Sequence, residues 1–359
     1  MWRLMRMRPL LMMCGVLTAA ASVGLILPAG PAYAKTHSAE LAAVSCVGST
    51  QCMAVGSYIN GAGKTAALAE VLNGRTWRLV SPARLLGRLT GVSCASASFC
   101  VAVGAAGKSG TTSVAVSWNG IRWRVMATPD PANGPLYDVS CVSSSFCMAT
   151  GGKAGAELWR GRRWRLSGVP LPPGSTSGLA AHISCDYSGF CLAVGYYTTD
   201  PQAQMPQALG ETWSGHVWSA TGNVAFPPDG KLTSTACTRH FGCMAVGNFN
   251  ANVTARWFLG WNLFPAPGPT ALTAVSCVNA ASNCMAVGHY AQAGAEFDLA
   301  DVWNGKTWHT TTSPHPAAGL TAVSCPQARN CVAVGAAANQ ATAEIWNGKT
   351  WRHLKTRSP

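Results

Sequence analysis

Fourteen of the fifteen cysteines fall into seven close pairs, and these pairs are the strongest chemical signal in the sequence. Thiols at such spacing form disulfides in an oxidising compartment or bind a metal. Zinc prefers about two to four residues between paired cysteines and needs further ligands. Five or six residues separate the cysteines here, so the spacing favours disulfides and predicts no metal site and no cofactor. The pairs are Cys46/Cys52, Cys94/Cys100, Cys141/Cys147, Cys185/Cys191, Cys237/Cys243, Cys277/Cys284 and Cys325/Cys331.

The pairs recur along the chain with a regular period. Their first members lie 48, 47, 44, 52, 40 and 48 residues apart. A fixed period of this length is typical of a repeat architecture, in which each unit is one supersecondary structure.

Each unit has the form L-x-x-V-S-C, C-x-A-V-G, a variable loop, an apolar stretch and W-N-G-x-x-W. The two cysteine segments are short β-suited runs joined by a hairpin, which the disulfide should lock. Asn-Gly between two apolar runs predicts a second hairpin, because both residues tolerate positive φ. One unit of four strands cannot bury both of its faces, whereas seven units closed into a ring can.

The sequence therefore predicts an all-β fold, a seven-bladed β-propeller with four antiparallel strands and one disulfide per blade. The propeller should span residues 41–359, with blades that start near residues 41, 89, 136, 179, 232, 272 and 320. The fifth unit is degenerate, since Ala236 precedes its first cysteine and only Trp257, Gly260 and Trp261 remain of its turn motif.

This unit resembles the blades of the Asp-box (BNR) and photosystem-II assembly-factor propellers. It is more similar still to secreted bacterial repeat proteins that share the paired cysteines and W-N-G. The resemblance covers about residues 41–355 and implies the propeller fold, but little about function. The chain departs from the Asp box, since no Ser-x-Asp precedes Gly305 or Gly348. Sialidases of this fold carry an arginine triad, and no arginine lies in an L-x-x-V-S-C segment here.

The N-terminus has the pattern of a cleaved export signal. Arg3, Arg6 and Arg8 precede an apolar run, which ends before Ala32-Tyr33-Ala34, a motif that signal peptidase accepts. We expect residues 1–34 to be removed and residues 35–40 to form a short flexible N-terminus. The mature protein should then be extracellular or associated with the cell envelope, and contact a membrane only during export.

Candidate binding residues lie in the variable loops, because the disulfide hairpins and the W-N-G turns fall on the opposite side of each blade. Aromatic residues recur two positions after the glycine of C-x-A-V-G, and we expect them to surround the mouth of the propeller. They are Tyr58, Tyr197, Phe249 and Tyr290.

The innermost strands add a polar group. The residue before the valine of V-S-C is Ala or Gly in four units, but Asp138, His182 and Ser234 in units three, four and five. A hydrolase triad is one interpretation and a polar lining of the channel is another, and Asp138 and His182 are candidate ligand contacts.

Positive charge concentrates at the W-N-G turns. The formal net charge is +13, and the third unit is the densest, with Arg160, Arg162, Arg163 and Arg165 around Trp164. These arginines could form a surface for anionic polymers, or simply be solvated turn tips. We expect no specific nucleic-acid binding.

The function that these patterns favour is non-catalytic binding of a cell-envelope glycan, an envelope polymer or a protein, by a monomer. The alternative is a glycan-active hydrolase or lyase on the same scaffold. The nearest candidates for paired carboxylates are Glu296, Asp298 and Asp301, but only 13 acidic residues occur in the whole chain.

Overall fold

The computed structural model describes residues 38–358 except 83–84, 108–109, 130–133, 153–154, 201–204, 222–225, 228, 240–241, 250–252, 267–270, 293–294 and 312–317. The chain divides into two units, residues 1–36 and 37–359. The expected signal peptide and the expected mature N-terminus at Lys35 lie outside the described residues.

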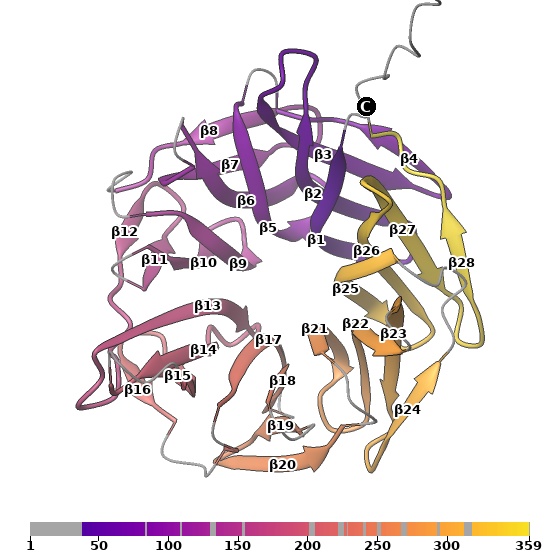
Figure 1. The fold of residues 1–359 in the computed structure, drawn as a ribbon. Coiled ribbons are helices and arrows are strands. Elements are labelled where there is room, and N and C mark those ends of the chain that lie inside the picture. The colour runs from indigo at the N-terminus through magenta and orange to yellow at the C-terminus, as the bar shows by residue number, and fades with distance from the viewer. Residues whose placement is uncertain are drawn as a thin grey trace, which may run out of the picture. The chain divides into compact units, whose positions relative to one another are not determined.

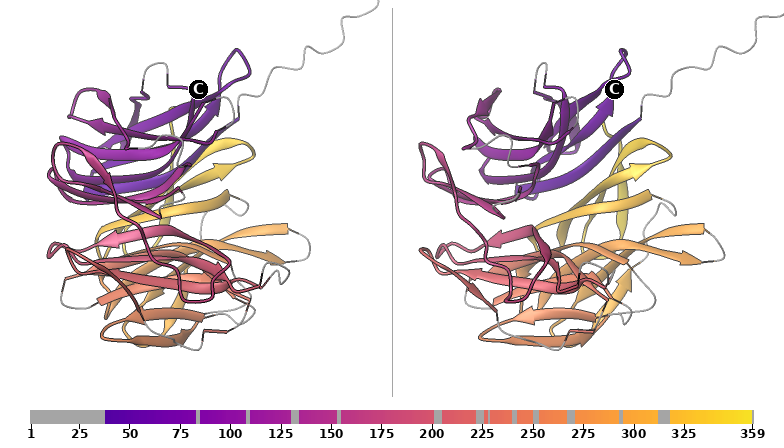
Figure 2. Two further views of the ribbon diagram at one scale, coloured as in Figure 1. Left: turned by 90° about the vertical axis from the view of Figure 1, so that its left-hand side faces the viewer. Right: turned by 60° about the vertical axis from the view of Figure 1, so that its left-hand side comes forward.

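The second unit is a seven-bladed β-propeller, as the sequence predicts. Seven sheets of four antiparallel strands each follow one another along the chain, and each sheet is built from four consecutive strands. The strands β1, β5, β9, β13, β17, β21 and β25 surround the centre of the ring, and the fourth strands lie at its rim (Figure 1). The side views show the seven sheets stacked around this centre (Figure 2).

Blades 1–4 contain β1 Ala39–Gly48, β2 Gln51–Ile59, β3 Thr65–Asn73, β4 Thr76–Leu79; β5 Gly87–Ser96, β6 Phe99–Ala106, β7 Thr112–Trp118, β8 Trp123–Met126; β9 Leu136–Ser143, β10 Phe146–Gly151, β11 Ala156–Trp159, β12 Trp164–Leu166; β13 Ser177–Cys185, β14 Cys191–Thr198, β15 Gln207–Trp213 and β16 Trp218–Ala220. Blades 5–7 contain β17 Lys231–Thr238, β18 Gly242–Asn248, β19 Val253–Trp257, β20 Trp261–Pro265; β21 Ala271–Asn279, β22 Asn283–Gln292, β23 Ala295–Trp303, β24 Trp308–Thr311; β25 Ala318–Gln327, β26 Asn330–Ala337, β27 Gln340–Trp346 and β28 Trp351–Leu354. No described segment forms a helix that is long and apolar enough to cross a bilayer.

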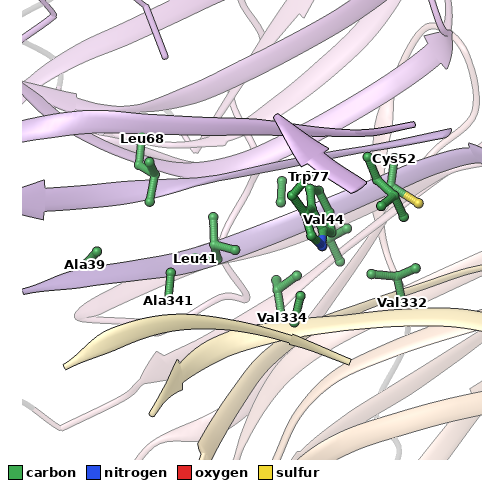
Figure 3. Packing of buried hydrophobic residues seen from close by; sticks show 12 residues of the cluster. Ala39, Leu41, Val44, Cys52, Leu68, Trp77, Val332, Val334 and Ala341 are labelled. Atoms are coloured by element: carbon green, nitrogen blue, oxygen red, sulfur yellow. The ribbon is translucent and has the colours of Figure 1, made fainter. Parts of the chain in front are cut away.

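The hydrophobic core is divided among the seams between blades, with one cluster of buried residues at each of the seven seams. At the seam between blades 7 and 1, Leu41, Leu68 and Trp77 pack against Val332 and Val334 (Figure 3). Each blade is too thin to have a core of its own, so burial of its two faces depends on both neighbours. The tryptophans of the turn motif are largely part of these clusters, which confirms that they pack between blades.

All seven predicted disulfides are confirmed, one in each blade, with Cα atoms 3.9–4.1 Å apart. Each joins the first and second strands of its blade. The bridges are Cys46–Cys52, Cys94–Cys100, Cys141–Cys147, Cys185–Cys191, Cys237–Cys243, Cys277–Cys284 and Cys325–Cys331.

Both cysteines of each bridge contact the same cluster at a seam, but the second is the more deeply buried. The sequence pattern predicts only that the bridges lock the hairpins, whereas the second cysteine of every pair is 0–3% exposed and belongs to a cluster at a seam. These seven are Cys52, Cys100, Cys147, Cys191, Cys243, Cys284 and Cys331. The second strand is the most deeply buried strand of each blade, so its cysteine sulfur also packs against the neighbouring blade. Each bridge therefore ties the hairpin to the core of a seam.

The serine of V-S-C is a clasp between blades. Its Oγ accepts a hydrogen bond from the backbone N–H of the first cysteine in the next blade, over 2.8–3.0 Å. Six of the seven seams have this contact. The pairs are Ser45–Cys94, Ser93–Cys141, Ser140–Cys185, Ser184–Cys237, Ser276–Cys325 and Ser324–Cys46. The seam between blades 5 and 6 has Ala236 at this position, and there Thr238 Oγ1 accepts the Ala280 N–H at 3.0 Å instead.

The ring closes without exchange of strands between its ends. Blade 7 consists only of β25–β28 and blade 1 only of β1–β4. Three contacts of the ordinary seam type join them: the Ser324 clasp, a hydrogen bond from Thr321 Oγ1 to the Leu41 carbonyl at 2.8 Å, and one from the Ala39 N–H to the Asn339 carbonyl at 2.9 Å. The C-terminal segment adds a fourth contact. The Arg357 N–H and the Ser358 hydroxyl donate to the buried carboxylate of Glu70 at 2.9 and 2.6 Å.

The repeated glycine of C-x-A-V-G is explained by a bulge in the innermost strand. In blade 1 the register between β1 and β2 shifts between Leu41 and Ala43, beside Gly56. The shift places the Glu40 carbonyl where a Cβ on Gly56 would lie, so no larger residue fits.

The W-N-G turns differ from the expected Asn-Gly geometry. In blade 6, Trp303 pairs with Trp308 and the loop between them has four residues. Gly305 has a φ of 98°, but Asn304 is not among the residues with positive φ. Asn304 instead accepts the N–H groups of Lys306 and Thr307 through Oδ1, each at 2.9 Å. The asparagine is therefore a side-chain acceptor that fixes the turn, and only the glycine supplies the unusual backbone.

Candidate functional site

The alternating strand directions give the disc two faces. The hairpin face carries the disulfide hairpins and the turns between the third and fourth strands. The loop face carries the loops between the second and third strands and the linkers between blades. On the hairpin face the disulfides and the Asx contacts hold the turns, so differences in shape between blades are concentrated on the loop face.

One cavity lies on the loop face between blades 1 and 2. It has a volume of about 980 Å³. Tyr58 and Ile59 at the end of β2 and Leu86 before β5 give it apolar surface, while Lys64 and Arg88 give it positive charge. Glu40 also lines it, and the Ser57 hydroxyl donates to Glu40 Oε1 at 3.0 Å. The cavity thus combines one aromatic ring with side chains of both charges.

The other three aromatic candidates lie elsewhere. Tyr197 lines a second cavity of about 350 Å³ in blade 4, and its hydroxyl donates to Gln207 Oε1 at 2.9 Å. Phe249 stacks on Phe226 with ring centroids 5.7 Å apart, and Tyr290 stacks on Phe297 at 5.3 Å. The four aromatics therefore have different surroundings. Two of them line separate cavities, and two have aromatic packing partners.

Asp138 and His182 lie side by side on the innermost strands of blades 3 and 4. Asp138 Oδ2 is 3.8 Å from His182 Nδ1, and both side chains are partly exposed. Asp138 also accepts the Ile183 N–H of the next blade through Oδ2 at 3.1 Å and the Val139 N–H through Oδ1 at 2.8 Å. Partial loss of solvation between the two strands raises the pKa of Asp138 to about 6. The same effect, together with the positive charge of Lys231, lowers the pKa of His182 to about 4, so His182 is neutral at neutral pH.

Ser234, the third residue of this group, makes the same kind of contact as Asp138. Its Oγ accepts the N–H of Val275 in blade 6 at 3.2 Å. No hydrogen bond joins Ser234 to His182 among the described residues. Asp138 and Ser234 thus hold neighbouring blades together, and a hydroxyl activated by His182 is not part of this arrangement.

A ring of buried carboxyl groups escaped the sequence analysis. In five blades an acidic residue on the third strand lies directly opposite the alanine of C-x-A-V-G, and each is 0–1% exposed. The five are Glu70, Glu157, Glu211, Asp301 and Glu344. An acidic residue two positions before the first tryptophan of the turn motif, as in Ala343-Glu344-Ile345-Trp346, is the signal that could have revealed them.

The candidate carboxylate pair of blade 6 is not freely exposed to a substrate. Asp301 is fully buried and Asp298 is 7% exposed, and the side chain of Glu296 is outside the described part of the chain. Burial raises the pKa of Asp301 to about 6 and that of Glu211 to about 7. No group of three or more potential metal ligands occurs among the described residues.

The arginine cluster of blade 3 is only partly free for a ligand. Arg160 Nη2 donates to the Gly215 carbonyl of the turn in blade 4 at 3.1 Å, and its guanidinium lies 5.4 Å from the centroid of the Phe146 ring. Arg160 therefore has a structural task in joining two turns. Arg162, Arg163 and Arg165 are exposed.

Retention on heparin tests the cluster as a polyanion surface. Replacing Arg162, Arg163 and Arg165 with serine should move elution to clearly lower salt, because exposed charges attract polyanions in a salt-dependent way. A matched control replaces Arg75, Arg122 and Arg124 with serine at the turns of blades 1 and 2. Equal shifts for both variants would mean that only net charge matters and that blade 3 holds no particular surface.

The comparisons with known proteins identify the fold alone. No family model matches the sequence, and no curated protein matches it. The chain is similar to a solved structure described as YCF48 bound to D1 peptide, with 14% identity, a TM-score of 0.56, and coverage of 84% of this chain and 92% of that one. It is similar to YCF48 from Cyanidioschyzon merolae, with 12% identity, a TM-score of 0.56, and coverage of 84% and 94%. The β-propeller domain of the Trilobed protease from Pyrococcus furiosus, described as having an open velcro topology, gives 8% identity, a TM-score of 0.59, and coverage of 90% and 100%.

Proposed function

We propose that this chain is an exported binding propeller that recognises a segment of a protein partner on its loop face. The observation that carries the proposal is the cavity of about 980 Å³ between blades 1 and 2. A cavity of this size on a rigid scaffold, with apolar walls and a few polar groups, is the usual form of a binding site. The similar structure described as YCF48 bound to D1 peptide supports a peptide as the kind of ligand.

The chemistry of the lining favours a peptide over a glycan. Tyr58 is the one aromatic residue among the described lining residues, so the cavity offers a single ring for stacking. Glu40, Lys64 and Arg88 instead provide charges of both signs, which suit the mixed side chains and the polar backbone of a peptide. The glycan ligand and the glycan-active enzyme are less well supported, because Asp298 and Asp301, the described members of the candidate carboxylate group, are buried.

Selection from a library of linear peptides, with a glycan array in parallel, tests this function. Peptides selected by the mature protein should bind Tyr58→Ala about 1–3 kcal/mol more weakly, since a ring in contact with the ligand is lost. Tyr290→Ala, at the equivalent position of blade 6, should bind them normally. Enrichment of glycans without peptides, or unchanged binding by Tyr58→Ala, would contradict the proposal.

Export completes the proposal. Seven disulfides suit an oxidising compartment, and the sequence of residues 1–34 has the pattern of a cleaved signal peptide. We expect the intact mass of the exported protein to correspond to a chain that starts at Lys35 with all fourteen paired cysteines oxidised. A chain that retains Met1, or that carries free thiols at the paired positions, would count against export.

A further inference from the structure

We infer that the second cavity, at the outer edge of blade 4, is a binding site for an alkylammonium group, with Glu211 as its anionic partner. This site is separate from the cavity between blades 1 and 2, and it does not depend on the function proposed for that cavity.

The cavity lies beside the first half of β15, beyond the end of the outermost strand of blade 4. Strand β16 stops at Ala220, so the first residues of β15, from Gln207, have no strand beside them on that side. Tyr197, Met205 and Phe226 line this space of about 350 Å³. Contacts with neighbouring residues hold two of these side chains in place. The Tyr197 hydroxyl donates a hydrogen bond to Gln207, and the Phe226 ring packs against the rings of Phe249 and Trp261, with ring centroids 5.7 and 5.3 Å apart.

A buried carboxyl without a partner lies in the lining of this cavity. Glu211 is 1% exposed, and its Oε2 has no hydrogen-bond partner among the described residues. A buried carboxylate oxygen that makes no hydrogen bond is costly, so an unpaired one in a cavity wall points to a missing donor. Burial without a counter-charge also raises the pKa of Glu211 to about 7.

The equivalent carboxyl in blade 1 shows what such a position can accept. Glu70 occupies the same place in its blade, opposite the alanine of C-x-A-V-G. There the C-terminal segment supplies both donors, the Arg357 N–H and the Ser358 hydroxyl. In blade 4 no described residue supplies a donor to Oε2 of Glu211, and Glu211 is among the residues that line the cavity.

The acidic lining favours a positively charged hydrogen-bond donor over a neutral one as the ligand of Glu211. Glu211 and Asp229 line the cavity, and no described lining residue is a lysine, arginine or histidine. The surroundings are unusual in a protein with a net charge of +13. The rings of Tyr197 and Phe226 add aromatic surface, which attracts ammonium groups as well as apolar stems. A primary ammonium on an alkyl chain matches all of these properties, whether it belongs to a lysine side chain or to a free diamine.

Two probes of the same shape test the site. Nα-acetyl-lysine methylamide carries the ammonium, and Nα-acetyl-norleucine methylamide has the alkyl chain without it. Binding to the mature protein is followed by the ¹³C-methyl NMR signal of Met205, which lies in the lining. We expect a saturable shift with the lysine probe at a Kd of about 1 mM or below, and binding at least 10-fold weaker with the norleucine probe. Cadaverine, as a third probe, shows whether a free diamine binds better than a lysine side chain.

Matched variants locate the interaction. Glu211→Gln should weaken the lysine probe at least 10-fold, whereas Glu344→Gln, at the equivalent position of blade 7, should not change its binding. Tyr197→Ala should weaken it several-fold and keeps the proposal testable if Glu211→Gln fails to fold. Equal binding of the lysine and norleucine probes would mean that the cavity binds only the alkyl chain, and this would overturn the inference. Absence of saturation by about 10 mM, or full binding by a folded Glu211→Gln, would overturn it as well.

Discussion

Without its last five residues, the propeller should lose about 3–5 kcal/mol of its free energy of unfolding. Residues 355–359 include the two groups that donate to Glu70, and the Glu70 carboxylate is completely buried. Truncation leaves this carboxyl group in the seam between blades 7 and 1 without its two donors, and a buried polar group that loses its hydrogen bonds is among the costlier single defects in a fold. Chemical unfolding of the full and the truncated mature protein measures the difference.

Side-chain variants separate this contact from other effects of the tail. Arg357 donates through its backbone, so the double variant Lys355→Ala, Arg357→Ala should be close to neutral. Ser358→Ala removes one donor and should cost about 1–3 kcal/mol. If the truncated protein is as stable as the full one, the tail is not part of the ring closure.

Reduction of the disulfides should have an even larger effect. Each bridge closes a loop of about seven residues, which corresponds to about 2.4 kcal/mol per bridge in the chain-entropy model. Stability in repeat proteins is roughly a sum over repeats and their interfaces, so seven such losses add up to about 17 kcal/mol, more than the whole stability of an ordinary domain. We expect the melting temperature to fall by more than about 10 °C in reductant.

Single-bridge variants make this prediction specific. Replacing Cys277 and Cys284 together with alanine should cost about 2–3 kcal/mol, and reductant should then lower the stability of that variant by one bridge less than in the unmodified chain. A melting temperature that is insensitive to reductant would mean that the seams alone hold the ring.

The architecture could be predicted from the sequence because the motifs that specify each blade are local and recur seven times. The cysteine period set the number of blades, and the residues that flank each pair set the first hairpin. The role of Asn304 was predicted wrongly, because a side chain that accepts two N–H groups and a backbone with positive φ both favour asparagine before glycine. Asp138 and Ser234 could be placed on innermost strands, but not assigned to contacts between blades, since that requires the offset of one blade against the next.

The candidate sites were less accessible to sequence analysis. Tyr58 and Tyr197 were selected from their position in the repeat, but the same rule also selected Phe249 and Tyr290, which have stacking partners. The partners Phe226 and Phe297 come from segments outside the repeat motif, so the motif alone cannot distinguish a ring in a cavity from a packed one. Glu211 was missed because its place in a cavity wall depends on residues outside the motif, such as Met205 and Phe226.

The serine clasps also imply an order in which the ring assembles. Within the chain each clasp joins residues 45–53 positions apart, but the clasp between Ser324 and Cys46 joins residues 278 positions apart. The entropy lost on closing a flexible loop grows with the logarithm of its length, so the last clasp costs about 1.6 kcal/mol more than the others before any neighbouring structure exists. Folding should therefore spread from blade to blade as a growing arc, in which each new blade shortens the effective distance between the two ends. Only when this arc is complete do the chain ends meet, and at that moment two exposed apolar flanks are covered in a single step.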